Sequence, residues 1–355
     1  MRCSRIDAIA VIVITQGANG QGASQVEWND FRCRFEVEYL GGLARKTDAS
    51  YGTALNAFKR LTDIQRLRSV NARLLGEFAI SLRGEGKSES TIEGYLRQLK
   101  VALRWAHRQE MLPAVPEFPV IRRAHHRKVM KGRAVTGEEF ERLIEAVPEV
   151  VGGAAAPEWI SLWRGLWWGG LRLGEALNLR WKALPHDDTP ILVDLDGAFP
   201  VFLVPAAGEK AHTDRILPMA PEFAQLLQET PDRKRCGRVF RVTGVKGNPI
   251  QSIDYASRIG AKFGKVAGIV VDTTLSGKVK YASAHDLRRA FGTRWSLRVM
   301  PAVLKELMRH ADISTTMRFY VGQNAQATAA TVWAAMPNGR QESNTLGNGT
   351  VRELG

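Results

Sequence analysis

The spacing of apolar positions predicts an N-terminal helical domain over residues 28–120. The clearest helix follows the sequence Ser90-x-x-Glu93, which is typical of a capping box. Shorter runs of the same kind predict helices that end near Leu61 and Leu82. In the helix after Ser90, apolar residues recur every three or four positions and form one face, which consists of Ile92, Tyr95, Leu96, Leu99, Leu103 and Ala106.

A proline-containing break at 113–119 ends this pattern, and new helices are predicted beyond it. Thr136-x-x-Glu139 is a second capping box and begins a short helix. A tryptophan-rich helix follows from about Pro157. Interleaved aromatic residues can indicate base stacking, but at helical spacing beside leucines they favour a place in the core. The residues in question are Trp159, Trp163, Trp167 and Trp168.

A small antiparallel sheet is predicted next by three short apolar runs at 191–195, 201–204 and 215–218. Lys210 lies in the connection between the second and third of these strands. Helical patterns return over 221–228 and 255–263. The fold class is therefore expected to be mainly α with a small antiparallel β-sheet, with a mixed α/β domain over 134–336.

Three segments show neither the helical nor the strand spacing of apolar residues. Residues 1–27 include an apolar run that resembles a weak signal peptide, but the run is short, contains Asp7 and lacks a clear cleavage site. We interpret these residues as a leader outside the folded domains, expected to be disordered. Residues 121–133 are basic and are interpreted as a linker. Residues 337–355 are polar, rich in glycine and asparagine, and expected to be disordered.

The charge of the chain favours a polyanionic partner. Among 355 residues, 50 are lysine or arginine and 36 are aspartate or glutamate, which gives a formal net charge of +14. Nucleic acid is therefore a more plausible partner than a membrane, although a merely basic protein remains the alternative. The helix after Ser90 carries a single-sign stripe opposite its apolar face, which suits contact with a phosphate backbone or, alternatively, a solvated surface. The stripe is Arg97, Lys100, Arg104 and Arg108, and the linker adds Arg122, Arg123, Arg127, Lys128 and Lys131.

The cysteines suggest neither a zinc-dependent nor a disulfide-rich class. Cys3, Cys33 and Cys236 are odd in number and far apart, which predicts neither a disulfide framework nor a metal site. A reducing, cytoplasmic location is the corresponding expectation. The apolar run near the N-terminus is too short to span a bilayer, so no membrane association is predicted.

The stretch 284–321 concentrates residues suited to phosphoryl chemistry. His285 and Arg288 are three positions apart in a helical pattern, so both project from one face. This pairs a proton-transfer group with a fixed cation that can grip a phosphate. His310 and Tyr320 follow within the same stretch, without a cluster of metal-ligand spacing.

The motifs of this stretch identify a family resemblance. They read H-D-L-R at 285–288, E-L-M-R-H at 306–310 and T-T-M-R-F-Y at 315–320, and G-G-L-R-L-G-E occurs upstream at 169–175. In this combination and order they resemble the tyrosine recombinases of the phage integrase family. The resemblance implies a core-binding, DNA-binding domain in the N-terminal helical region and a tyrosine-recombinase catalytic domain after the linker.

The resemblance also implies roles for individual residues, without metal or cofactor. Two arginines would hold the phosphate, two histidines would donate or transfer protons, a hairpin lysine would protonate the leaving 5′-oxygen, and a tyrosine would attack. In this chain the corresponding residues are Arg172, Lys210, His285, Arg288, His310 and Tyr320, with Glu175 in support and His212 as an alternative to the lysine. Arg289 stands where the family often has histidine, and Arg309 stands where it usually has glycine. Neither residue is expected to carry chemistry.

The implied function is site-specific recombination of DNA through a 3′-phosphotyrosyl intermediate, as in an integrase of a mobile element or a resolvase. Expected partners are double-stranded DNA and three further copies of the chain, forming a homo-tetramer on paired sites, with accessory DNA-bending proteins as further candidates. Two alternatives remain. One is a DNA-binding protein on the same scaffold that does not cut, and the other is an activity like that of type IB topoisomerases.

Overall fold

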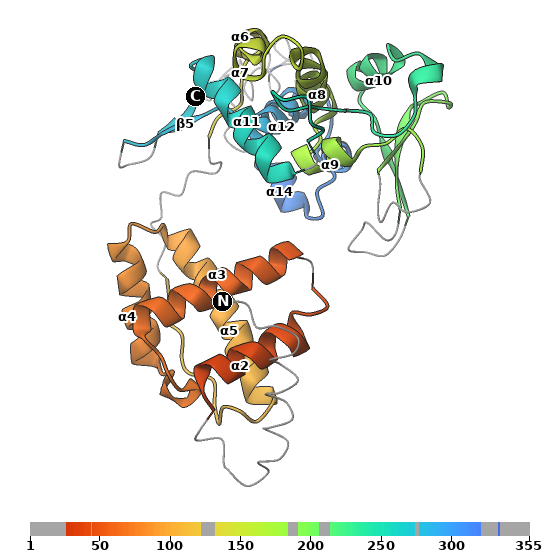
Figure 1. The fold of residues 1–355 in the computed structure, drawn as a ribbon. Coiled ribbons are helices and arrows are strands. Elements are labelled where there is room, and N and C mark those ends of the chain that lie inside the picture. Colours follow the sequence, from red (N-terminus) through yellow and green to blue (C-terminus); the bar gives the residue numbers. More distant parts are fainter. Residues whose placement is uncertain are drawn as a thin grey trace, which may run out of the picture. The chain divides into compact units, whose positions relative to one another are not determined.

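The computed structural model describes residues 26–43, 45–121, 132–183, 191–205, 214–250, 252–273 and 277–320, together with Trp333. The chain divides into two compact units, residues 1–127 and 128–355. Helices dominate both units, and the second also contains two small antiparallel sheets (Figure 1). The predicted fold class, mainly α with a small antiparallel sheet, is confirmed.

The first unit is a set of helices around an aromatic core. Its fully buried rings include Trp28, Phe31, Phe35, Phe58 and Phe78, which contact one another. Edge-to-face and offset ring contacts of this kind add to the free energy gained from burial. The elements are α2 (Trp28–Arg34), η1 (Phe35–Tyr39), α3 (Arg45–Thr62), η2 (Leu67–Ser69), α4 (Ala72–Gly84) and α5 (Glu89–Arg108).

The start of α5 differs from the prediction. Its N-cap is Ser88, whose hydroxyl accepts the Thr91 backbone N–H at 3.3 Å, so Ser90 lies inside the first turn and is not the cap. Glu89 is held by a two-pronged ion pair with Arg83 at the end of α4. This pair favours a short connection, which starts the helix two residues earlier than the Ser90-x-x-Glu93 pattern indicated.

The second unit combines helices with two antiparallel sheets. The predicted three-stranded sheet is present with the order β1-β2-β3, and Phe202 in its central strand pairs with Val193 and Leu217. A second pair, β4 with β5, was not predicted. Its strands are short and Val271 is their one buried residue, so they lack an apolar alternation. The elements are α6 (Gly137–Glu145), α7 (Val147–Val151), α8 (Ala156–Gly169), α9 (Leu173–Asn178), β1 (Leu192–Asp194), β2 (Val201–Val204), β3 (Arg215–Pro218), α10 (Pro221–Gln228), η4 (Asp232–Lys234), α11 (Ile253–Val266), β4 (Val270–Thr273), β5 (Val279–Tyr281), α12 (Ala284–Ser296), α13 (Pro301–Leu307) and α14 (Ile313–Met317).

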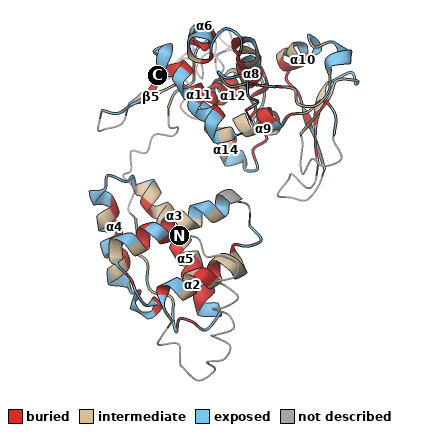
Figure 2. Cartoon of the chain, viewed as in Figure 1, coloured by how far each residue is buried: buried red, intermediate tan, exposed pale blue. Residues whose placement is uncertain are grey.

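The tryptophan-rich helix α8 is central to the second unit, as its buried colouring in Figure 2 shows. Trp159, Trp163 and Trp167 are buried and Trp168 is half-buried, which confirms the core interpretation over base stacking. The Trp159 indole N–H donates to the Thr243 carbonyl at 2.8 Å, so the ring is buried without losing its hydrogen bond.

Helix α12 packs against α8 and also against a smaller apolar cluster formed by α13 and α14. Gly292 permits this second contact, because a Cβ there would lie 2.5 Å from the Phe319 ring. Through these contacts α12, the turn after α13 and the end of α14 are held together. They carry His285 and Arg288, His310, and Tyr320 respectively.

Expectations about cysteines, membrane spans and metal ligands can also be compared with the structure. Cys236 is free and exposed, Cys33 is buried in α2, and Cys3 lies outside the described residues. In the described parts of the chain no helix is long and apolar enough to cross a bilayer. The same ranges contain no group of side chains arranged to hold a metal ion.

Candidate active site

The carboxylate of Glu175, in the first turn of α9, is surrounded by three arginines. Its Oε2 atom accepts the Arg172 backbone N–H at 2.7 Å, and its Oε1 accepts the Arg172 guanidinium at 2.5 Å. Arg309 Nε lies 3.3 Å and Arg288 Nη1 lies 3.9 Å from Oε2. The predicted support of Arg172 by Glu175 therefore has a geometric basis, but Glu175 serves two further arginines as well.

The carbonyl oxygen of Gly170 is the second meeting point of the cluster. Arg288 Nη1 donates to it at 2.5 Å and Arg309 Nη2 at 2.9 Å, while Arg288 Nη2 donates to the Met308 carbonyl. Gly170 ends α8 in the left-handed conformation, with φ of 56°, and an added Cβ would collide with Phe291. A glycine is thus required at the point where two guanidinium groups bind.

Arg309 occupies a tight turn that glycine usually fills. The His310 N–H donates to the Lys305 carbonyl and the Arg309 N–H to the Glu306 carbonyl, both at 3.0 Å, which is the Schellman arrangement at the end of α13. Arg309 has φ of 50° in this turn. The left-handed conformation costs a residue with a side chain about 1 to 2 kcal/mol. Its guanidinium is buried and also donates to the Leu307 carbonyl at 3.0 Å.

Arg309 is a site residue that the sequence analysis missed. The position was assigned no chemistry because it lies where the family usually has glycine. The structure instead brings its side chain to Glu175 and Gly170, beside Arg288. The sequence feature that could have pointed to Arg309 is a long cationic side chain at a position where glycine, which has no side chain, is usual.

The electrostatics of the cluster follow from its burial and its excess of cations. Burial alone would raise the pKa of Glu175, but the charges of Arg309, Arg288 and Arg172 together lower it to about 2. Burial, followed by the charge of Arg309, brings the pKa of Arg288 well below its usual value. Three guanidinium groups share one carboxylate, so the cluster retains a positive excess that an anion such as a phosphodiester can neutralise.

His310 lies beside this cluster and is held by α14. Its side chain is buried, Nδ1 lies 2.9 Å from the Thr316 hydroxyl, and its ring stacks on Phe319. Burial first, then the charges of Arg288, Arg172 and Arg309, lower its pKa to about 4. His310 is therefore uncharged at neutral pH, and its Nε2 atom has no hydrogen-bond partner in the described ranges.

His285 lies in the first turn of α12 with its side chain exposed. Partial enclosure and the nearby charge of Arg289 lower its pKa. Arg289, at the position where the family often has histidine, is bound to Asp286, which also accepts from Lys280 and from the Ser283 hydroxyl. Arg289 therefore belongs to a separate ion-pair network on the same helix.

The Tyr320 hydroxyl binds a backbone carbonyl and not the arginines around Glu175. It donates to the Val299 carbonyl at 2.6 Å, and the Tyr320 ring packs against the small apolar cluster that includes Leu304 and Leu307 of α13. Burial raises the pKa of this half-buried phenol. Within the part of the chain that the structure describes, no hydrogen bond links Tyr320 to Arg172 or Arg288. Lys210 and its alternative His212 lie outside the described residues.

The basic stripe of the first unit lies on the surface of α5. Arg97, Arg104 and Arg108 are exposed, and the Lys100 ammonium sits 5.6 Å from the Phe118 ring. None of the four forms an ion pair with any residue that the structure describes. The predicted linker contacts Arg122, Arg123, Arg127, Lys128 and Lys131 fall outside the described ranges.

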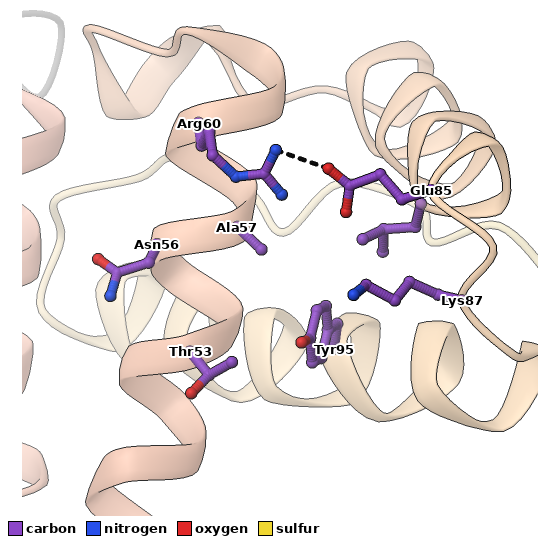
Figure 3. Close-up of a pocket in the computed structure, with 8 residues that line it drawn as sticks. Thr53, Asn56, Ala57, Arg60, Glu85, Lys87 and Tyr95 are labelled. Atoms are coloured by element: carbon purple, nitrogen blue, oxygen red, sulfur yellow. Dashed lines mark ion pairs between the residues drawn. The ribbon is translucent and has the colours of Figure 1, made fainter.

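A cavity of about 290 Å³ opens between α3, α4 and α5 in the first unit (Figure 3). Its cation Arg60 is paired with Glu85 at 2.6 Å, while Lys87 and Tyr95 lie on its other side. Glu85, the acidic side chain of the lining, is thus already paired with Arg60. The cavity gives no evidence for a specific ligand, in contrast to the unbalanced cluster around Glu175.

Comparison with known proteins identifies the family of the chain. The sequence model described as "Phage integrase family" matches residues 133–327. The fold is similar to that of the Tn1549 transposon integrase in complex with transposon right end DNA, with a TM-score of 0.59, 18% identity, and coverage of 87% of this chain and 99% of that chain. No curated protein matches the sequence.

Lambda integrase gives a second structural comparison. Its dimer bound to a COC′ core site matches with a TM-score of 0.62 and 15% identity, covering 84% of this chain and 98% of that chain. Its tetramer bound to a Holliday junction matches with a TM-score of 0.60 and 15% identity, covering 90% of this chain and 87% of that chain. At these identities the comparison establishes the fold.

The family match spans more than half of the chain and includes the residues that converge on Glu175. The protein therefore belongs to the phage integrase family. It is an enzyme of the tyrosine recombinase type, which acts in site-specific DNA recombination.

Proposed function

We propose that the protein cuts and rejoins double-stranded DNA with Tyr320 as nucleophile and the cluster around Glu175 as the phosphate site. The observation that carries this proposal is the convergence of Arg172, Arg288 and His310 from three separate elements. Guanidinium groups remain charged and can bind non-bridging phosphate oxygens in pairs. They would neutralise the charge that builds up on those oxygens during the displacement.

The chemistry requires a phenol that is acidic at the moment of attack. Forming phenolate from an ordinary tyrosine at neutral pH costs about 4 kcal/mol. Burial raises the pKa of Tyr320 in its present position, so this position is unsuited to attack. In our proposal the hydroxyl exchanges the Val299 carbonyl for the phosphate, where nearby guanidinium groups favour the anion.

Attack by Tyr320 on phosphorus forms a 3′-phosphotyrosyl bond and breaks the bond to the 5′-oxygen, which leaves as a hydroxyl after gaining a proton. We assign that proton to Lys210, with His285 assisting transfer and neutral His310 donating a hydrogen bond to a phosphate oxygen. A second DNA 5′-hydroxyl then attacks the phosphotyrosyl bond and releases Tyr320. The phosphodiester is conserved throughout, so neither a nucleotide nor a redox cofactor enters the balance.

DNA binding in this proposal involves both units. The cations on α5, which have no acidic partner among the described residues, would contact phosphates of the duplex, and the basic linker would add further contacts. Lambda integrase, which is similar in fold, is seen as a tetramer on a Holliday junction. We propose the same assembly for this protein, because exchange of strands between two duplexes requires four cleavage events.

Covalent capture on a pool of random-sequence duplexes tests the proposal. Wild-type protein is incubated with the pool, in which each duplex is nicked so that the short 5′-hydroxyl fragment dissociates after cleavage. Adducts that resist denaturing detergent are recovered and sequenced. We expect adducts of one related sequence from the wild type and from Tyr255→Phe, a matched change of an exposed tyrosine in the same unit. Adduct formation by Tyr320→Phe would refute the assignment of the nucleophile.

The same assay separates the alternatives. A protein that binds DNA without cutting would show salt-dependent binding of the pool but no adduct from the wild type. An activity like that of type IB topoisomerases would relax supercoiled plasmids and give adducts of unrelated sequence. The complete set of catalytic residue types argues against the non-cutting alternative, and the separate N-terminal helical unit favours the recombinase over the topoisomerase.

A further inference from the structure

Arg309 makes contacts that connect three parts of the catalytic cluster. Its Nη2 atom donates to the carbonyl of Gly170, two residues before Arg172, and its Nε atom lies 3.3 Å from Glu175. Its backbone forms the turn that delivers His310. One side chain thus bridges the end of α8, the start of α9 and the turn after α13.

The location of this side chain argues for a specific role. A left-handed turn at the end of a helix is most easily made by glycine, yet here it carries a long cationic residue. The guanidinium is buried at 8% exposure and faces Glu175, Arg288 and, on β3, Arg215. A strained backbone and a buried charge are both unfavourable, and such features persist where the surrounding structure compensates them and function requires them.

We propose that Arg309 is a positioning residue of the recombination reaction, which fixes Glu175 and the Gly170 carbonyl so that Arg172 and Arg288 present their guanidinium groups to the phosphate. This inference rests on the proposed function of the cluster. Arg309 does not itself touch the phosphate in this scheme, because Nη1 and Nη2 each donate to a backbone carbonyl and Nε faces Glu175. It acts through the groups that it holds.

The charge of Arg309 supports the same role. Glu175 faces Arg172 from α9, Arg288 from α12, and Arg309 and His310 from the turn after α13. Of the three arginine charges that lower the pKa of Glu175, the charge of Arg309 has the largest effect. Without Arg309 the carboxyl would retain a proton at a higher pH, and a protonated carboxyl can no longer accept both bonds from Arg172.

The test compares Arg309→Gly, Arg309→Met and Arg309→Lys with the wild type, using the nicked duplex recovered by covalent capture. Arg309→Gly removes the guanidinium while relieving the backbone, so the fold is expected to persist. We expect the rate of adduct formation at neutral pH to fall roughly 10- to 100-fold in Gly and Met, since small misplacements of reacting groups have effects of that size. In these two variants the acid limb of the pH–rate profile should move to higher pH. Arg309→Lys should restore part of the rate and part of the wild-type profile.

Arg294→Met is the matched control. Arg294 is a half-buried arginine of the second unit, and it packs on the Trp167 ring and donates to the Trp167 carbonyl. Its replacement should lower thermal stability without moving the pH–rate profile. If Arg309→Gly and Arg309→Met show the wild-type rate and profile, or lose rate only in proportion to stability as Arg294→Met does, the proposal is overturned.

A measurement that needs no DNA keeps this inference separate from the proposed function. Denaturant unfolding of each protein is followed between pH 7 and pH 3. In Arg309→Met, the loss of stability due to protonation of Glu175, which begins near pH 4.5 in both proteins, should be smaller than in the wild type because the folded-state pKa lies closer to 4.5. In Arg294→Met this loss should equal that of the wild type. An unchanged pH dependence in Arg309→Met would refute the role, whether or not the wild type forms adducts.

Discussion

Two groups of arginines in this protein illustrate opposite uses of positive charge. The stripe on α5 is exposed and has no acidic partner in the described ranges. The cluster around Glu175 contains the buried Arg288 and Arg309 and shares a single carboxylate. The stripe is open to solvent and salt, whereas the cluster is enclosed by protein.

The difference determines what each group can do. Exposed cations bind phosphates by releasing counterions, so they contribute affinity that weakens as salt rises. Buried cations are held in fixed directions by carbonyl oxygens and are screened far less, so they can stabilise charge at a defined point. The stripe should therefore control how tightly DNA is held, and the cluster should control how fast a strand is cut.

The largest effect is expected from Arg288→Met, measured against Arg104→Met on α5. Loss of Arg288 leaves the Met308 carbonyl without its donor, leaves the Gly170 carbonyl with Arg309 alone, and removes one of the proposed phosphate ligands. We expect adduct formation to fall about 10²- to 10³-fold and unfolding free energy to fall by about 1 to 3 kcal/mol. Arg104→Met should retain the cleavage rate at saturating protein. Equal losses of rate in the two variants would remove the distinction between stripe and cluster.

Glu175→Gln should alter both cleavage and the pH dependence of stability. The pKa of Glu175 is about 2 in the folded protein and ordinarily 4.5. Its lowered pKa contributes stability that is present above pH 4.5 and is lost as the pH falls toward 2. The full contribution is on the order of 3 kcal/mol. Denaturant unfolding at pH 7, 5 and 3 should show this part of the pH dependence disappear in the variant, and cleavage should fall about 10-fold or more.

Glu139→Gln is the control for this change. Glu139 lies in the same unit, and its pKa is also lowered to about 2, chiefly by its bonds to Arg133. Its replacement should reduce the pH dependence of stability but leave the cleavage rate unchanged. His310 adds a loss of stability between pH 6.5 and 4, because its pKa is lowered and the unfolded chain binds the proton first. Because the charge of Glu175 raises the pKa of His310, Glu175→Gln should extend this loss to lower pH, whereas Glu139→Gln should leave it unchanged.

The smallest effects are expected on α5. Arg104→Gln and Arg108→Gln should each reduce DNA affinity a few-fold and lower the slope of log affinity against log salt by about 0.9, with stability nearly unchanged. Arg73→Gln on α4 is the control, because Arg73 is exposed but paired with Glu77. Titration of a fluorescent duplex at several salt concentrations measures the slopes. Slopes that match the wild type would show that α5 does not contact DNA.

Much of the fold was predictable because local patterns determine it. The Thr136 capping box forms as predicted, with both of its hydrogen bonds present, and strands β2 and β3 have the predicted bounds. The tryptophans of α8 were assigned to the core by their helical spacing. The pair β4 and β5 was missed because its short strands derive their pairing from hydrogen bonds between segments and not from an apolar alternation.

The order of residue types along the chain was enough to identify the kind of chemistry, since Arg172, His285, Arg288, His310 and Tyr320 are recognisable in it. Which side chains meet became clear only in the folded molecule. Folding placed Arg309 among the cations and bound the Tyr320 hydroxyl to the Val299 carbonyl. The cause is separation along the chain. A motif records residue types within a short span, whereas the Gly170 carbonyl receives donors from residues more than a hundred positions away, which come together only on folding.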